Sequence, residues 1–185
     1  QPDDRGYVAH YEDNSAERML SLLKAIGHGD LQKIECINKD ASEIDPTQIK
    51  LAPEIIFIDG EHTKEAVLSD FIFCEKVVSK SGLILFHDFY NICPAIAEIC
   101  KNLRRKGHKH IALKLDHNVF GIFFDRDTID ADAHLASLYK RNSRFLERFL
   151  FRYRMKQVLP GSLFSAAKVL YNKMMKTNNK GDSIA

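Results

Sequence analysis

The sequence predicts an α/β fold: a mostly parallel sheet with helices on both faces and an antiparallel hairpin at its C-terminal end. Two short runs, Ile55 to Ile58 and Leu83 to Phe86, are apolar without interruption, which is typical of strands buried on both faces of a parallel sheet. Segments with helical spacing of apolar residues separate these runs. Two later apolar segments, Ile111 to Leu115 and Val119 to Phe124, are joined by a link short enough for a hairpin. This alternation of strands and helices indicates the α/β class.

The composition fits a globular protein with a real core. The 185 residues are 45% hydrophobic and 28% charged, and the net charge of +2 is too small to argue for nucleic acid as the main partner. No apolar run approaches the ~20 residues of a membrane-spanning helix, and residues 1–5 do not begin a signal peptide. We therefore expect a cytoplasmic protein without a transmembrane segment.

The cysteines favour the same interpretation. There are four, at positions 36, 74, 93 and 100, and no two form a Cys-x-x-Cys pair. Because three of them lie within apolar stretches, we interpret them as buried, reduced thiols of a cytosolic protein and not as a zinc site or a disulfide framework.

The chain before the first apolar run predicts one helix and one strand. Residues 1–13 lack a pattern and predict a loop. Ser15 can cap a helix that ends at the Gly27 to Gly29 segment, with apolar residues spaced three and four apart: Met19, Leu22, Leu23 and Ile26. The alternation over Leu31 to Ile37 predicts a strand, residues 38–42 a turn, and residues 44–49 a short helix.

Two longer helices are expected around the second apolar run. Thr63 can cap a helix whose inner face carries Val67, Phe71, Cys74 and Val78. Pro94 suits the first position of another helix, which Gly107 would end and whose apolar face carries Ile96, Ile99, Cys100 and Leu103.

The C-terminal part predicts helices. Residues 130–138 and 163–175 have helical patterns, Pro160-Gly161 interrupts them, and the polar residues 178–185 predict disorder. Arg141 to Arg154 mixes arginines with aromatic residues and could bind acidic lipid or a partner helix, although packing or a homo-oligomer contact through the C-terminal helices is favoured. We expect three units: residues 1–127, an α/β domain; residues 128–177, a helical extension; and residues 178–185, a tail.

Polar residues follow both apolar runs. Asp59 and His62 come after the first run, and His87 and Asp88 come directly after the second. Since parallel strands bring their carboxyl ends to one edge, where ligands bind in open α/β sheets, we expect all four side chains on one rim.

The residues around this rim resemble a known family. Phe57 to Asp70 reads Phe-Ile-Asp-Gly-Glu-His-Thr-Lys-Glu-Ala-Val-Leu-Ser-Asp, and Ser81 to Phe89 reads Ser-Gly-Leu-Ile-Leu-Phe-His-Asp-Phe. The pair resembles the class I S-adenosylmethionine-dependent methyltransferases, and most closely their small-molecule and sugar O-methyltransferase branch, over roughly residues 15–124. The resemblance implies a Rossmann-like sheet, S-adenosylmethionine as cofactor, and a sugar or natural-product hydroxyl as methyl acceptor.

The sequence departs from this family near its start. The family has a glycine-rich loop after its first strand and an acidic residue at the end of its second, and no such pair of features precedes Ser15. The nearest candidate, Gly27-His28-Gly29, follows a predicted helix. We therefore expect an N-terminally truncated version of the domain, as would arise from an incomplete chain.

The resemblance also implies roles for individual residues. Asp40 would accept a hydrogen bond from the adenine amino group, with the backbone amide of Ala41 facing the ring, although Asp40 could equally cap a turn. Asp59 would help to bind the cofactor, and His62 would be the general base that deprotonates the acceptor hydroxyl.

A metal ion is a further expectation. Asp59, His87 and Asp88 could hold a divalent cation such as Mg²⁺ or Mn²⁺. Related enzymes have an acid where this chain has His87, so the site could instead favour manganese, iron or zinc, or hold no metal. The alternative for Asp59 and Asp88 is that they cap the turns and helices that follow them.

The leading functional hypothesis is thus O-methylation of a small molecule, with His62, Asp59 and Asp88 as catalytic residues. Because the glycine-rich loop is missing, a non-catalytic methyltransferase-like remnant or partner-binding module is the alternative. A metal-dependent α/β hydrolase is a third possibility.

Overall fold

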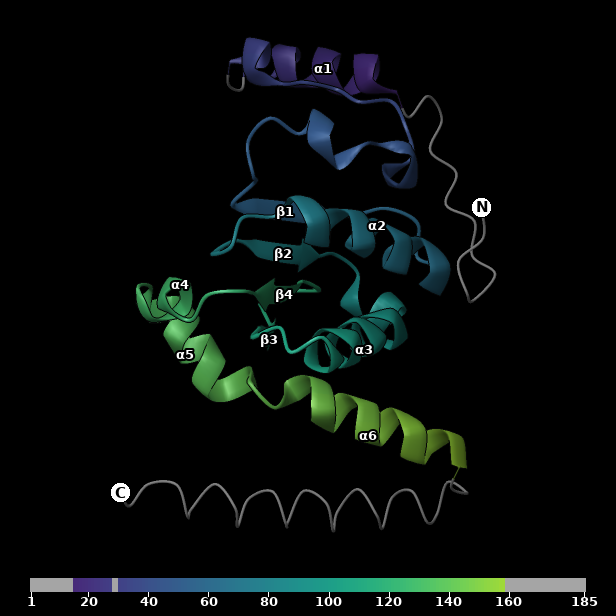
Figure 1. The fold of residues 1–185 in the computed structure, drawn as a ribbon, viewed down its shortest axis with the longest axis vertical. Coiled ribbons are helices and arrows are strands. Elements are labelled where there is room, and N and C mark those ends of the chain that lie inside the picture. The colour runs from purple at the N-terminus through teal and green to yellow at the C-terminus, as the bar shows by residue number, and fades with distance from the viewer. Residues whose placement is uncertain (1–14, 28–29, 159–185) are drawn as a thin grey trace.

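A computed structural model of the chain describes residues 15–27 and 30–158 (Figure 1). The predicted N-terminal loop, the helix over 163–175 and the C-terminal tail lie outside the described residues. Within the part of the chain that is described, no helix combines the length and the apolar character needed to cross a bilayer.

The described strands form one mixed sheet in the order β1-β2-β4-β3 (Figure 1). β1 (Ile55–Ile58) and β2 (Leu83–Phe86) pair in parallel, whereas β4 (Phe120–Phe123) is antiparallel to both β2 and β3 (Ile111–Lys114). The predicted α/β class, the two neighbouring apolar strands and the terminal hairpin are confirmed. The sheet is mixed instead of mostly parallel over the described strands, because the returning hairpin strand inserts next to β2.

Helices cover both faces of this sheet, as predicted. α2 (Lys64–Val77), α3 (Phe89–Arg105) and α6 (Phe145–Val158) contribute to a core cluster on one face. α4 (Asp127–Asp130) and α5 (Ala133–Asn142) contribute to a second cluster on the other face. Packing of the Arg141 to Arg154 stretch against its own chain is therefore confirmed, while a homo-oligomer contact stays a prediction.

The alternation of side chains along β2 explains how one strand serves two cores. Ile84 and Phe86 are fully buried in the first cluster, whereas Leu83 packs against the second. Successive side chains of a strand point to opposite faces of a sheet, so a strand covered on both sides must be apolar throughout.

The burial of β1 on both faces is a prediction that proves wrong. Ile58 is buried in the first cluster and Ile56 packs against it, but Ile55 and Phe57 remain 64% and 53% exposed. The reason is that the second cluster reaches only β3, β4 and the start of β2, so the described helices leave this face of β1 uncovered.

The chain before β1 is mostly irregular. α1 (Ala16–Ala25) forms where expected: Ser15 caps it by accepting from the backbone N–H of Arg18 at 3.2 Å, and Gly27 ends it at a φ of +64°. The strand predicted over 31–37 is wrong. That segment starts with the 3₁₀ turn η1 (Leu31–Lys33), and it pairs with no strand among the described residues.

Two further 3₁₀ turns stand near the predicted short helix of residues 44–49. They are η2 (Ala41–Glu43) and η3 (Pro46–Gln48), each capped by the aspartate that precedes it. The alternating residues 31–37 do not form a strand because an alternating pattern also needs tertiary partners, and this segment lacks them among the described residues.

α3 begins at Phe89, five residues earlier than predicted, so Pro94 lies inside the helix. Proline has no N–H, and it therefore leaves the carbonyl of Tyr90, four residues back, without its helical donor. The Cys93 thiol instead donates to this carbonyl, with Sγ 3.9 Å from the oxygen. A local substitute donor thus lets the helix pass through the proline.

The cysteine prediction is right for three residues and wrong for one. Cys74, Cys93 and Cys100 are buried, and burial raises the pKa of Cys74 to about 12 and those of Cys93 and Cys100 to about 11. Cys36 is exposed, because its segment does not join the sheet.

Candidate functional site

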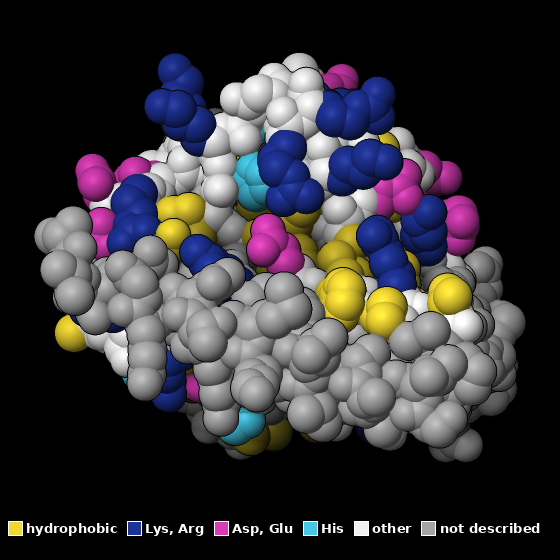
Figure 2. All heavy atoms as spheres, turned by 90° about the horizontal axis from the view of Figure 1, so that it is seen from below, with side chains coloured by type: hydrophobic (Ala, Val, Ile, Leu, Met, Phe, Trp, Pro, Cys, Tyr) yellow, Lys and Arg dark blue, Asp and Glu magenta, His cyan; other side chains and the backbone are white. Residues whose placement is uncertain are grey.

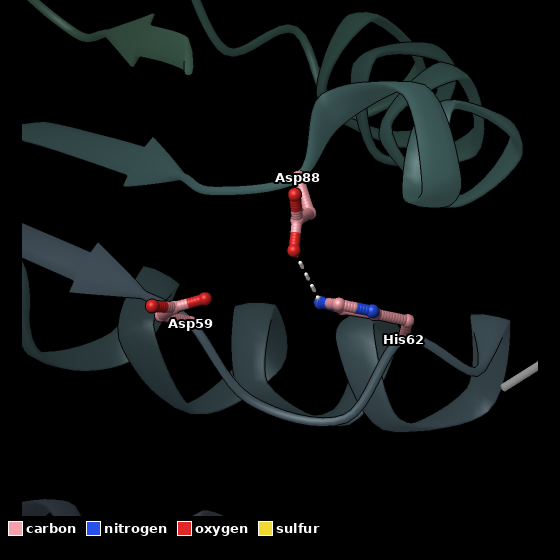
Figure 3. A group of neighbouring side chains, drawn as sticks. All are labelled: Asp59, His62 and Asp88. Carbon is pink, nitrogen blue, oxygen red and sulfur yellow. Dashed lines mark ion pairs between the residues drawn. The ribbon is translucent and has the colours of Figure 1, made fainter. Parts of the chain in front are cut away.

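The predicted rim forms at the carboxyl ends of β1 and β2. Asp59 follows β1, His87 and Asp88 follow β2, and His62 lies in the loop that leads from Asp59 to α2. Nε2 of His62 is 3.2 Å from Oδ2 of Asp88. Figure 3 marks this ion pair with a dashed line. Nδ1 of His87 is 3.1 Å from Oδ1 of Asp59 and 3.5 Å from Oδ2 of Asp88. The parallel pairing of two strands thus brings four polar side chains from two loops together.

The ion pair between His62 and Asp88 determines which ring nitrogen of His62 is available to accept a proton. Both side chains are about one quarter exposed, at 26% and 27%. A neutral imidazole carries one N–H, and the carboxylate of Asp88 favours that proton on Nε2. Nδ1, for which no bond to a described residue is found, then carries the lone pair that can accept a proton. The pair therefore has the form of a base oriented by a carboxylate.

Asp88 is held in place by Asn118, from the link between β3 and β4. Nδ2 of Asn118 donates to Oδ1 of Asp88 at 2.7 Å. The backbone of Asp88 has a φ of 50° and lies in the left-handed region, and its side chain makes no capping bond to α3. The backbone carbonyl of Asn118 accepts from the N–H of Phe89, and its Oδ1 accepts from the N–H of Tyr90. Asn118 therefore caps α3 in place of Asp88 and leaves that carboxylate to His62.

Lys114 supports the link that presents Asn118. Its side chain is 5% exposed, and its Nζ donates to the carbonyls of Leu115, at 2.6 Å, and of His117. Burial lowers the pKa of Lys114, an effect that nearby Asp116 opposes. Sequence reasoning missed both Asn118 and Lys114. The available signal was a lysine that ends an otherwise apolar strand, two residues before a turn.

Three side chains of the rim can reach a common metal ion. One ligand atom each from Asp59, His62 and Asp88 lie within 4.8 Å of one another (Figure 3). The predicted set had His87 in place of His62; Nδ1 of His87 also lies near both carboxylates. Two carboxylates and an imidazole suit Mn²⁺, Fe²⁺ or Zn²⁺ at least as well as Mg²⁺.

Asp40, expected to contact adenine, caps a turn in this structure. Its Oδ1 accepts from the backbone N–H of Ser42 at 2.9 Å and from the Ser42 hydroxyl at 2.6 Å, and these bonds lower its pKa. Ala41 is the first residue of η2, which contacts α2. The capping role is therefore observed, while contacts of Asp40 and Ala41 with adenine stay predictions.

Asp70, in α2, faces the loop after β1. Its Oδ2 lies 3.1 Å from where a Cβ on Gly60 would be, so the loop passes close above it. Partial burial raises the pKa of Asp70, and the charges of Asp40 and Glu61 raise it further. Glycine at position 60 permits this close approach.

Four further histidines of the described residues lie outside the rim. His108, His117 and His134 are exposed, and His110 is half-buried, with Nδ1 3.0 Å from the carbonyl of His108.

The chain is similar to a known protein family. A protein family described as a methyltransferase domain matches residues 5–89, slightly less than half of the chain, and this range contains the whole rim. No curated protein matches the chain. The similarity supports methyltransferase activity in general, and such a domain implies S-adenosylmethionine as its cofactor.

Proposed function

We propose that this protein transfers a methyl group from S-adenosylmethionine to a hydroxyl of a sugar or other small molecule. The observation that carries the proposal is the His62–Asp88 pair, at the sheet edge that lies within the methyltransferase match. Hydroxyl acceptors need a base because an alkoxide attacks a methyl sulfonium far better than an alcohol does, and a histidine oriented by a carboxylate is suited to that task.

The proton movement follows from the geometry of the pair. The acceptor hydroxyl gives its proton to Nδ1 of His62, while Nε2 stays paired with Oδ2 of Asp88, 3.2 Å away. The carboxylate of Asp88 then stabilises the imidazolium that forms. Asn118 keeps the carboxylate in place through its 2.7 Å bond to the other oxygen. When bound, S-adenosylmethionine supplies the methyl group on a positively charged sulfur.

The rim has groups that suit this cofactor. The ammonium, ribose hydroxyls and adenine amino group of S-adenosylmethionine are hydrogen-bond donors, and carboxylates are strong acceptors for them. Asp59, whose side chain is half exposed, would take the cofactor at the rim, and Asp40 with Ala41 would take the adenine end. No glycine-rich loop follows a strand among the described residues, which leaves these carboxylates as the main anchors we propose.

Calorimetric titration with S-adenosylhomocysteine, the reaction product, tests the cofactor part of the proposal. We expect saturable heat with the 185-residue chain. Absence of binding to the folded chain would remove the methyltransferase proposal.

His62→Ala tests the base. Loss of a general base slows turnover by roughly 10²- to 10⁴-fold, whereas affinity for S-adenosylhomocysteine should hardly change. Transfer of labelled methyl to a panel of sugar and phenol acceptors provides the rate, and calorimetry provides the affinity. His134→Ala, at an exposed histidine outside the rim, is the matched control. Turnover in His62→Ala equal to that of the control would exclude His62 as base.

Binding of a metal ion by Asp59, His62 and Asp88 is the alternative to a general-base role for His62. An ion bound by these three residues would replace the direct pairing of His62 with Asp88. Titration with Mn²⁺, followed by the loss of its solution electron-spin resonance signal, separates the two uses. Stoichiometric binding that Asp59→Asn abolishes would favour the metal.

The alternative function is a non-catalytic, partner-binding module, which the lack of a glycine-rich loop after a strand among the described residues would favour. A folded chain that shows no detectable binding of S-adenosylhomocysteine would support it.

A further inference from the structure

Two segments that are far apart in sequence carry much of the positive charge of the chain. Residues 101–110 contain five Lys or Arg and no acidic residue, and residues 140–154 contain six with Glu147 as their one acid. The net charge of the whole chain is only +2. Positive charges are therefore concentrated in these two segments, although the net charge of the chain is small.

The fold places these segments side by side. The first is the end of α3 and the turn after it, the second is the end of α5 and most of α6, and α3 contacts α6. We define the basic surface by its five exposed cations that line two hollows at this junction: Lys101, Arg104, Arg105, Lys109 and Arg154.

The hollows bring cations from different elements together. One, of about 300 Å³, lies between Lys101 and Arg105 of α3 and Arg154 of α6. The other, of about 330 Å³, has Arg104 and Lys109 on one side and the α5–α6 junction on the other. Figure 2 shows dark blue Lys and Arg side chains around a recess that also contains yellow hydrophobic and magenta acidic side chains. Glu98 and Glu147 are among the residues that line the two hollows. Such a surface can receive several phosphate groups at once.

α6 also carries apolar side chains on its outer side. Its inner side packs Leu146 and Phe149 into the core. Phe151 and Val158 are nevertheless 40% and 78% exposed, and Arg152 and Arg154 lie between them in the sequence. Arginines interspersed with exposed aromatic and aliphatic residues are typical of helices that lie in a membrane interface.

We propose that the basic surface and the outer side of α6 dock the protein onto a bilayer that contains acidic phospholipids. Cations within a Debye length of such a surface are attracted to it, and the apolar residues of α6 gain from entering the headgroup region. A nucleic acid would satisfy the cations but would offer no apolar environment to Val158 or Phe151. This proposal does not depend on methyl transfer.

Co-sedimentation of the full 185-residue chain with lipid vesicles tests the proposal. We expect binding to vesicles of phosphatidylglycerol in phosphatidylcholine, weakening with salt, and little binding to phosphatidylcholine alone. The variant Arg104→Gln/Arg105→Gln/Arg154→Gln should bind about a hundredfold more weakly, since each cation near the surface contributes roughly fivefold.

The matched control removes three exposed cations elsewhere: Lys39→Gln/Lys50→Gln/Lys80→Gln has the same net charge as the first variant. It should keep most of the affinity, and circular dichroism checks that both variants fold. Three outcomes would overturn the proposal: no binding to the acidic vesicles, an equal loss in the control, or tighter binding to single-stranded RNA than to the vesicles. S-adenosylhomocysteine titration of the same samples reports separately on the proposed function.

Discussion

Asn118 shows how a single side chain can organise the rim. It donates to Asp88 and accepts from the first turn of α3, so one residue orients the carboxylate and caps the helix. A hydrogen bond to a charged group contributes roughly 1.5–3 kcal/mol, and its loss would also free Asp88 to rotate away from His62.

We therefore expect Asn118→Ala to lower both the free energy of unfolding, by about 2 kcal/mol, and the rate of methyl transfer. Urea denaturation measures the first and the labelled-methyl assay the second. Asn38→Ala, at an exposed turn position, is the control. A double-mutant cycle with Asp88→Ala separates positioning from folding: additive rate effects would show that Asn118 does not act through Asp88.

The four cysteines should differ sharply in reactivity. The thiolate is the reactive form, and burial keeps Cys74, Cys93 and Cys100 protonated at neutral pH by raising their pKa values to about 11 or 12. We expect iodoacetamide to modify one thiol, Cys36, in the folded chain and all four in urea, as counted by mass spectrometry. The variant Cys36→Ser should then take up none while folded. Rapid modification of more than one thiol would contradict the packing of α2 and α3.

The sequence predicts where a side chain lies when its position depends only on the residues next to it in the chain. Asp59 directly follows β1 and Asp88 is the second residue after β2, so the parallel pairing of the strands brings them to the same edge of the sheet. Asn118 could not be predicted in this way, because its role requires the β3–β4 link to reach the start of α3, which is a matter of tertiary packing.

Among the elements, α3 contains a local conflict between sequence and structure. Pro94 is exposed at the sixth position of the helix, and a proline beyond the first turn costs about 3 kcal/mol. The thiol of Cys93 offsets part of this cost by donating to the carbonyl of Tyr90. The helix nevertheless forms because its inner face buries eight residues, including Ile96 and Leu103.

Pro94→Ala should therefore stabilise the protein, by about 1–3 kcal/mol, since it restores a backbone donor to Tyr90. Urea denaturation gives the change in unfolding free energy. Pro46→Ala is the control, because Pro46 begins η3, where no backbone donor is needed, and it should not stabilise. A decrease in stability for Pro94→Ala would mean that the proline itself sets the course of the first turn.

Elements whose sequence signals are local were predictable. α2 matches its prediction because its cap and its apolar spacing are local, and Thr63 accepts from the N–H of Ala66 as expected. The segment over 31–37 alternates as a strand would, but a strand also requires a neighbour, and the described sheet has none beside it. The start of α3 was misplaced because proline marks a first turn only on average.

For the molecule as a whole, the uncovered face of β1 is the main departure from a closed α/β layer structure. β1 stands at the end of the described sheet, so its backbone groups on the side away from β2 have no partner strand. Ile55 adds an exposed apolar side chain to this edge. Edges of this kind are sites of self-association.

We expect Ile55→Lys to reduce self-association of the 185-residue chain by roughly tenfold, because it places a charge where an apolar contact would form. The unfolding free energy should change little, since Ile55 is 64% exposed and already contacts water. Sedimentation velocity over a range of concentrations measures the association. Ile56→Lys is the matched control: one position along the strand, it would place the charge against the first core cluster and should unfold the protein instead. If Ile55→Lys left association unchanged, the edge of β1 would not be where copies meet, and the C-terminal helices would become the first alternative.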